Sequence, residues 1–134
     1  MRFRLTVPAA LEAPGVVRDA LGAFEDHVPP QMLEDARLMA TELVTNAVRH
    51  GGLARSEALD VVAEGSPRGV RVEVIGGRRP FPAPEPPPHL ATSGWGLYLV
   101  GRLSTRWGMF RGGNGTSVWF EIGSPAGSGR GEPG

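Results

Sequence analysis

Cysteine and lysine are both absent from the 134 residues, and all 14 basic side chains are arginines. Without cysteine the chain has no disulfides, thiolate zinc sites or cysteine nucleophiles. Without lysine it has neither Schiff-base chemistry nor the phosphate-binding lysine of a P-loop. The chain also lacks a net charge, because 14 acidic residues balance the arginines. We therefore expect no direct binding to nucleic acid.

Long hydrophobic runs are missing as well. No stretch reaches the roughly 18 apolar residues of a membrane span, and Met1 to Val7 alternates polar and apolar residues, unlike a signal peptide. With 40% hydrophobic content, the chain suits one compact soluble domain. We expect no membrane association and a cytoplasmic location, which the lack of cysteine also favours.

Hydrophobic periodicity and turn residues predict both strands and helices. The expected strands are 2–7, 58–63, 70–75, 107–111 and 116–122, with hairpin turns at 64–69 and 112–115. The expected helices are 14–27, 31–50 and a short one over 97–103 whose Leu103 is available to the core. Hairpins combined with a few helices favour an α+β two-layer sandwich, with helices covering one face of a mixed, mostly antiparallel sheet.

Two segments lack periodicity. Residues 76–93 contain six prolines and exceed the usual loop length of compact domains, so we interpret them as a mobile lid. Residues 123–134 are rich in glycine, serine and proline and are expected to be a disordered tail. The prediction is a single domain over 1–122 that carries the lid.

Glu42, Asn46 and His50 lie four residues apart on the longest predicted helix, so they should form one ridge. The ridge borders the apolar stripe of that helix and is followed at once by Gly51 and Gly52. A carboxylate, an amide and an imidazole placed in this way could hold a water, a cation and an anionic ligand in one cleft. The competing interpretation is an ordinary polar helix edge.

Gly94 and Gly96 precede the short predicted helix. Glycines at this position let backbone N–H groups approach a phosphate at the positive end of the helix dipole. In a chain without lysine, this is the natural phosphate cradle, although a simple tight turn has the same pattern.

The order of these motifs resembles the GHKL ATPase superfamily, which has the Bergerat fold of gyrase, histidine kinases and MutL. Within it, the sequence is most similar to anti-sigma factor serine/threonine kinases of the RsbW and SpoIIAB type. Residues 41–51 resemble the N box of that group, and residues 94–100 resemble its second glycine box. Residues 104–107 and 115–120 resemble the end of the family pattern.

The resemblance implies an ATP site with Mg²⁺, in which Asn46 is the metal ligand and Glu42 the general base. It places His50 near the phosphates. It further implies nucleotide contacts from the remaining candidates, Gly76, Gly77, Gly94, Gly96, Leu97 and Thr116. The implied partners are a sigma factor and a STAS-like anti-sigma antagonist, and the chain could be a homodimer.

One position departs from the family pattern. The relatives have an adenine-binding aspartate at the end of the strand before the lid, and here Gly76 stands in that place. Gly76 has the parity of Val72 and Val74, so it should lie on the helix side of the sheet. Loss of the carboxylate predicts weaker ATP binding and weaker selection for adenine.

Three hypotheses remain open from the sequence. The first is an ATP-dependent protein kinase that phosphorylates the antagonist and sequesters the sigma factor. The second is a regulator of the same fold that acts by protein contact without nucleotide, which Gly76 favours. The third is a metal-dependent hydrolase that uses Glu42 and His50, for which no further ligand has suitable spacing.

Overall fold

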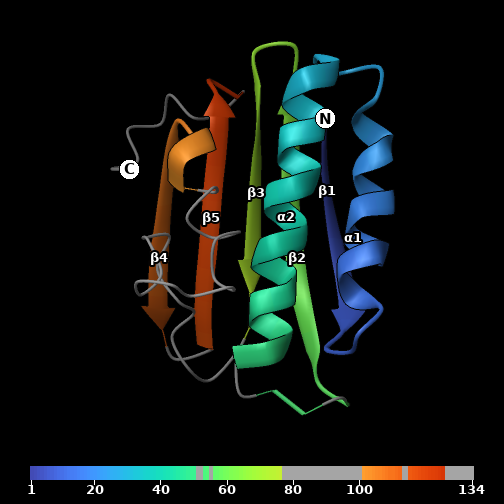
Figure 1. The fold of residues 1–134 in the computed structure, drawn as a ribbon, viewed down its shortest axis with the longest axis vertical. Coiled ribbons are helices and arrows are strands. Elements are labelled where there is room, and N and C mark those ends of the chain that lie inside the picture. The colour runs from blue at the N-terminus through green and yellow to red at the C-terminus, as the bar shows by residue number, and fades with distance from the viewer. Residues whose placement is uncertain (51–52, 55, 77–100, 113–114, 126–134) are drawn as a thin grey trace, which may run out of the picture.

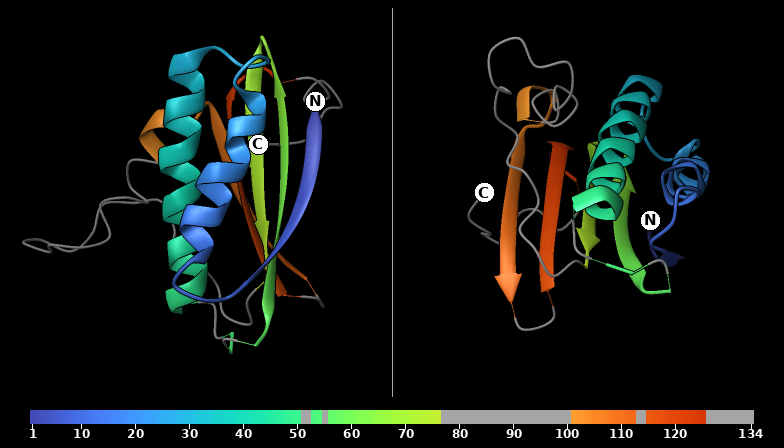
Figure 2. Two further views of the ribbon diagram at one scale, coloured as in Figure 1. Left: turned by 90° about the vertical axis from the view of Figure 1, so that its right-hand side faces the viewer. Right: turned by 60° about the horizontal axis from the view of Figure 1, so that its bottom comes forward.

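A five-stranded sheet carries two helices on one of its faces (Figures 1 and 2). The computed structural model describes residues 1–50, 53–54, 56–76, 101–112 and 115–125. The strands are β1 (Arg2–Pro8), β2 (Ala58–Ser66), β3 (Gly69–Ile75), β4 (Arg106–Gly112) and β5 (Gly115–Gly123), and the helices are α1 (Ala13–Ala20), the short 3₁₀ helix η1 (Leu21–Phe24) and α2 (Pro30–His50). The strand order is β1-β2-β3-β5-β4, and each described pairing is antiparallel. The expected α+β two-layer sandwich is confirmed.

The core lies between α2 and the sheet. Alternate residues of the central strands, such as Val72, Val74 and Phe120, are fully buried on the helix side. Ala40, Leu43 and Ala47 of α2 are buried equally well. Because successive strand residues point to opposite faces, the remaining side chains of these strands form the outer face of the sheet.

The predicted helix over 14–27 is wrong in its second half. Helix α1 ends at Ala20, and η1 then carries Leu21 and Phe24 into the core, where neither side chain is exposed. A 3₁₀ helix places residues three positions apart on the same side, so the side chains of Leu21 and Phe24 can both point inward. The Phe24 ring packs on Phe3 of β1 with 5.3 Å between the centroids.

Two further expectations need correction. The turn predicted over 64–69 is shorter, because β2 continues to Ser66 and β3 begins at Gly69. The Gly65 backbone lies against Phe24 of η1 and Val28, where an added Cβ would be 2.8 Å from Val28, so the glycine lets β2 pass close to both side chains. Leu103, expected in the core, is 40% exposed.

A charged cluster on the outer face joins three strands. The register aligns Arg71 of β3 and Arg106 of β4 with Glu121 of β5. Arg106 donates to Glu121 Oε1 through Nε at 2.9 Å and Nη2 at 2.7 Å, and Arg71 Nε lies 3.4 Å from Oε2. Arg71 also stacks over Trp119, 4.5 Å from the ring centroid. Since the Glu121 side chain is only 3% exposed, its charge depends on the two arginines.

We expect Arg106→Met to lower the free energy of unfolding by about 1 to 3 kcal/mol, because it removes the closest partner of a buried carboxylate. Urea denaturation measures the change. Arg4→Met is the matched control, since Arg4 pairs with Asp60 at 2.8 Å but is 63% exposed, and exposed pairs contribute about 1 kcal/mol or less. Equal losses in the two variants would contradict the role assigned to the cluster.

Candidate functional site

Helix α2 places Glu42 and Asn46 at the edge of its buried stripe. Both residues are partly buried, whereas Leu43 and Ala47 beside them are fully buried. Arg37 lies on the opposite edge of the helix and reaches Glu25, next to η1, at 3.3 Å. The edge with Glu42 and Asn46 therefore points away from α1 and toward β5 and β4, which lie on that side of α2 in Figure 1.

The amide of Asn46 is held in one orientation. Its Nδ2 donates a 2.8 Å hydrogen bond to the backbone oxygen of Glu42, one turn earlier. This bond leaves Oδ1 as the atom that can bind a ligand, and amide oxygens are suitable ligands for Mg²⁺. Within the described part of the chain, no side chain pairs with the Glu42 carboxylate, so it is available as a proton acceptor.

The end of β3 and the start of β5 form the second part of the site. The Gly76 N–H donates to the backbone oxygen of Thr116 at 2.9 Å. Thr116 has the parity of Val118 and Phe120, so its side chain faces the helix side of the sheet. Thr116 is only 2% exposed, and its Oγ1 has no hydrogen-bond partner among the described residues. A buried hydroxyl in this state fits a position that a ligand completes.

Gly76 has a conformation that side chains rarely adopt. Its φ is +138°, and an added Cβ would lie 2.8 Å from Leu59 Cδ2 of β2. This contact confirms the predicted parity, because Leu59 belongs to the helix-side core. Leu59 was not identified from the sequence, although extending the β2–β3 register by one residue beyond Asp60 and Ile75 would have placed it opposite Gly76. The strand end is thus apolar at the position where the family resemblance leads us to expect an aspartate.

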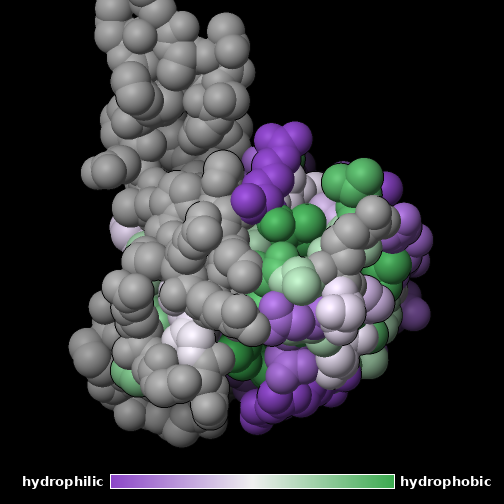
Figure 3. Space-filling model, turned by 90° about the horizontal axis from the view of Figure 1, so that it is seen from below, coloured by the Kyte–Doolittle hydropathy of each residue, from purple (hydrophilic) through white to green (hydrophobic). Residues whose placement is uncertain are grey.

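Helix α2 contacts both β3 and β5, so the two parts of the site lie on the same side of the sheet. Figure 1 shows the end of α2, the end of β3 and the start of β5 at the same end of the molecule, and Figure 3 views that end directly. The structure thus brings Glu42 and Asn46 to the same end as Gly76 and Thr116. The other candidates lie outside the described residues, namely the side chain of His50, Gly77, Gly94, Gly96 and Leu97. The predicted lid beyond Gly76 and most of the predicted tail also lie outside them.

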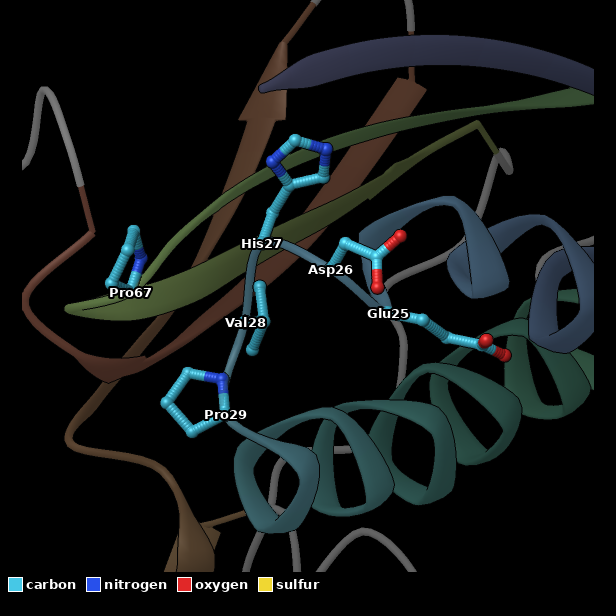
Figure 4. Close-up of a pocket in the computed structure, with 6 residues that line it drawn as sticks. All are labelled: Glu25, Asp26, His27, Val28, Pro29 and Pro67. Carbon is cyan, nitrogen blue, oxygen red and sulfur yellow. The ribbon is translucent and has the colours of Figure 1, made fainter.

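A separate shallow pocket of about 230 Å³ lies at the opposite end of α2. It is lined by Glu25, Asp26, His27, Val28, Pro29 and Pro67 (Figure 4). The acidic and imidazole groups point in different directions there, and no group of three potential metal ligands occurs among the described residues. We assign no chemistry to this pocket.

Comparison with known proteins identifies the family. The sequence model of the histidine kinase-like ATPase domain matches residues 7–122. The chain therefore belongs to this family, and the resemblance seen in its motifs is confirmed. Comparison with curated proteins gives no match.

A solved structure has the same fold. It is the crystal structure of the RsbU and RsbW domains of Rv1364c from Mycobacterium tuberculosis, with a TM-score of 0.69 and 23% identity. The similarity covers 91% of this chain and 32% of that one, so this chain spans about a third of the length of its structural relative. None of the described helices is long and apolar enough to cross a membrane.

We expect Gly76→Ala to destabilise the chain by about 1 to 3 kcal/mol. Alanine rarely adopts the positive φ of this position, and its Cβ would lie too close to Leu59. Thermal or urea denaturation measures the loss. The control is Gly15→Ala in α1, where an added Cβ meets nothing within 4 Å. That substitution should be neutral or stabilise the helix by up to about 1 kcal/mol. An unchanged stability of Gly76→Ala would contradict the conformation described for this position.

Proposed function

We propose that this chain is an ATP-binding anti-sigma regulatory protein that phosphorylates a serine or threonine of an antagonist protein and sequesters a sigma factor. Membership of the histidine kinase-like ATPase family supports nucleotide binding. The observation that carries the proposal is the amide of Asn46, whose Nδ2 is bonded to the Glu42 backbone while Oδ1 stays available one turn from the Glu42 carboxylate.

Asn46 would hold Mg²⁺ through Oδ1. When bound, the ion neutralises part of the negative charge of the nucleotide phosphates. Thr116, whose buried hydroxyl has no hydrogen-bond partner among the described residues, and Gly76 would line the base end. We propose that His50, Gly94, Gly96 and Leu97 surround the phosphates, and that Gly77, next to Gly76, also contacts the nucleotide.

Glu42 would act as the general base. The hydroxyl oxygen of the protein substrate attacks the γ-phosphorus, the bond to the ADP oxygen breaks, and the hydroxyl proton passes to the Glu42 carboxylate. ADP leaves and the phosphoester remains on the antagonist. Among the described residues the Glu42 carboxylate has no ion pair, which suits this proton transfer, and such a transfer typically contributes about 10²- to 10⁴-fold to a rate.

The partners follow from the similarity to anti-sigma kinases of the RsbW type. We propose a sigma factor and a STAS-like antagonist as the proteins bound, and a homodimer as the possible assembly. The structural relative contains an RsbW domain together with an RsbU domain, and this similarity supports the proposed partners.

A second function is favoured by one observation. Gly76, with its positive φ and its contact with Leu59, removes the carboxylate that relatives use for adenine. A chain of the same fold could regulate by protein contact alone, without nucleotide. The two functions differ in whether the natural chain binds MgATP.

Calorimetric titration with MgATP tests the first function. We expect measurable binding by the natural chain and at least about tenfold weaker binding by Asn46→Ala, because the variant lacks the amide ligand. Titration with ATP in EDTA should show little difference between the two, since the lost interaction is to the ion. Thr45→Ala, the neighbouring and partly buried position, is the control and should bind like the natural chain. No binding at millimolar MgATP would favour the nucleotide-independent function.

Glu42→Gln separates catalysis from binding. Glutamine keeps the size of the side chain but cannot accept the proton, so we expect phosphotransfer to fall by about 10²-fold or more while the Kd for MgATP changes by less than about threefold. The reaction is followed with γ-labelled ATP and STAS-like antagonist proteins from the same organism, with mass spectrometry to locate the phosphoester. Full transfer by the variant would remove Glu42 from the role of base.

A further inference from the structure

Helix α2 carries a second carboxylate on the edge that holds Glu42. Asp35 lies seven residues before Glu42, and seven residues turn an α-helix by about 700°, so the two positions are within about 20° of each other around the helix. Both side chains are partly buried, as expected at the border of the buried stripe. The edge that faces β5 and β4 in Figure 1 therefore continues from Glu42 toward the start of the helix.

The charge of Asp35 is not neutralised within the described part of the chain. Its Oδ1 accepts a 3.1 Å hydrogen bond from Gln31 Nε2, one turn earlier, and no described arginine forms an ion pair with it. The neighbouring Glu34 differs, because Arg37 Nη1 lies 3.2 Å from its Oε1. Asp35 is thus an oriented carboxylate whose attraction for a cation is not used by the fold.

An apolar side chain lies between the two carboxylates along the helix. Leu38 is 44% exposed, whereas Met39 beside it is fully buried. Leu38 follows Asp35 by three residues and precedes Glu42 by four, and residues at these spacings are neighbours on a helix surface. Asp35, Leu38 and Glu42 therefore border one continuous strip, which we call the docking strip. A bound segment that covered Leu38 would remove apolar surface from water.

The dimensions of the docking strip fit an extended segment of protein. Seven helix residues span about 10 Å, and an extended chain advances about 3.3 Å per residue, so three residues cover the distance from Glu42 to Asp35. A hydroxyl placed at the Glu42 carboxylate brings the third residue along the chain to Asp35 and the residues between them to Leu38. An arginine or lysine at that third position would meet a carboxylate that has no described cation beside it.

We propose that the docking strip binds the protein substrate, and that the preferred serine or threonine has an arginine or lysine three residues away with an apolar residue between them. This inference rests on the phosphotransfer of the proposed function and specifies its protein substrate. The charge of Asp35 and the continuity of its edge with Glu42 are the observations that carry it.

The test measures phosphotransfer from γ-labelled MgATP by the full chain to two synthetic peptides. Each peptide has one serine flanked by leucines, and the positions three residues before and after the serine are arginine in one peptide and glutamate in the other. We expect kcat/KM to be at least about fivefold higher for the arginine peptide, because an exposed charge pair contributes up to about fivefold. Equal values would overturn the inference and leave the proposed function intact, and so would transfer to a STAS-like antagonist protein but to neither peptide. Failure of transfer to the antagonist proteins and to both peptides would overturn both.

Three substitutions test the residues of the docking strip. Asp35→Arg should reverse the preference and make the glutamate peptide the better substrate. The matched control is Glu34→Arg, which changes the charge equally at a position turned by about 100° and should retain the arginine preference. Leu38→Gln removes an apolar contact that does not depend on charge, so it should raise KM for both peptides alike, by about threefold or more.

Folding and nucleotide binding are measured on the same variants. Because the three positions lie at the helix surface, we expect the melting temperature and the Kd for MgATP to stay close to those of the natural chain. An arginine preference that persisted in Asp35→Arg would overturn the role of Asp35. An unchanged KM in Leu38→Gln would remove Leu38 from the docking strip.

Discussion

The rotational position of α2 on the sheet is the constraint on which the site depends. Small residues such as Ala40 and Ala47 let the helix approach the valine layer of β3, and Leu43 fills the space between them. Successive helix residues are turned by about 100°, so a one-residue rotation in one direction would bring Glu42 to the buried position of Leu43, and a rotation in the other direction would move Leu43 to the partly buried position of Glu42. Because a fully buried Leu contributes about 1.5 to 3 kcal/mol and burying a lone charge costs more, packing alone holds Glu42 at the helix edge.

The packing of α2 also fixes the position of Asn46. The same rotation that buries Ala47 places Asn46 at the edge that faces β5 and not α1. Its side chain then returns one N–H to the Glu42 backbone, so only the oxygen remains for a ligand. A serine or alanine at this position would satisfy the helix equally well but could not present a neutral oxygen at that distance from the backbone. The polar residues Glu42 and Asn46 are thus compatible with the stability of the helix, and their functional role is the one proposed above.

Local periodicity was sufficient to predict the ridge and the parity of Gly76, because both follow from the geometry of one element. The break after Ala20 was not predicted, since it arises when Phe24 packs on Phe3 of a distant strand. The exposure of Leu103 likewise depends on which elements cover it. The state of the Thr116 hydroxyl, which has no hydrogen-bond partner among the described residues, could not be recognised, because it depends on the register of β5 with its neighbouring strands. The sequence supplied the candidate residues of the site, and tertiary contacts determine the burial and hydrogen bonding of those that the structure describes.

The proposed base end of the site involves three strands, because Leu59 lies in β2, Gly76 follows β3 and Thr116 lies in β5. Restoring a carboxylate at position 76 would require a side chain at φ +138° and a new position for Leu59, which is fully buried in the core. The hydrogen bond from Gly76 to Thr116 would be strained by the same change. The glycine at position 76 therefore fits both the packing of Leu59 and the backbone hydrogen bond to Thr116. In the proposed function, the apolar strand end at position 76 leaves the phosphates and the ion proposed at Asn46 as the main sources of binding free energy.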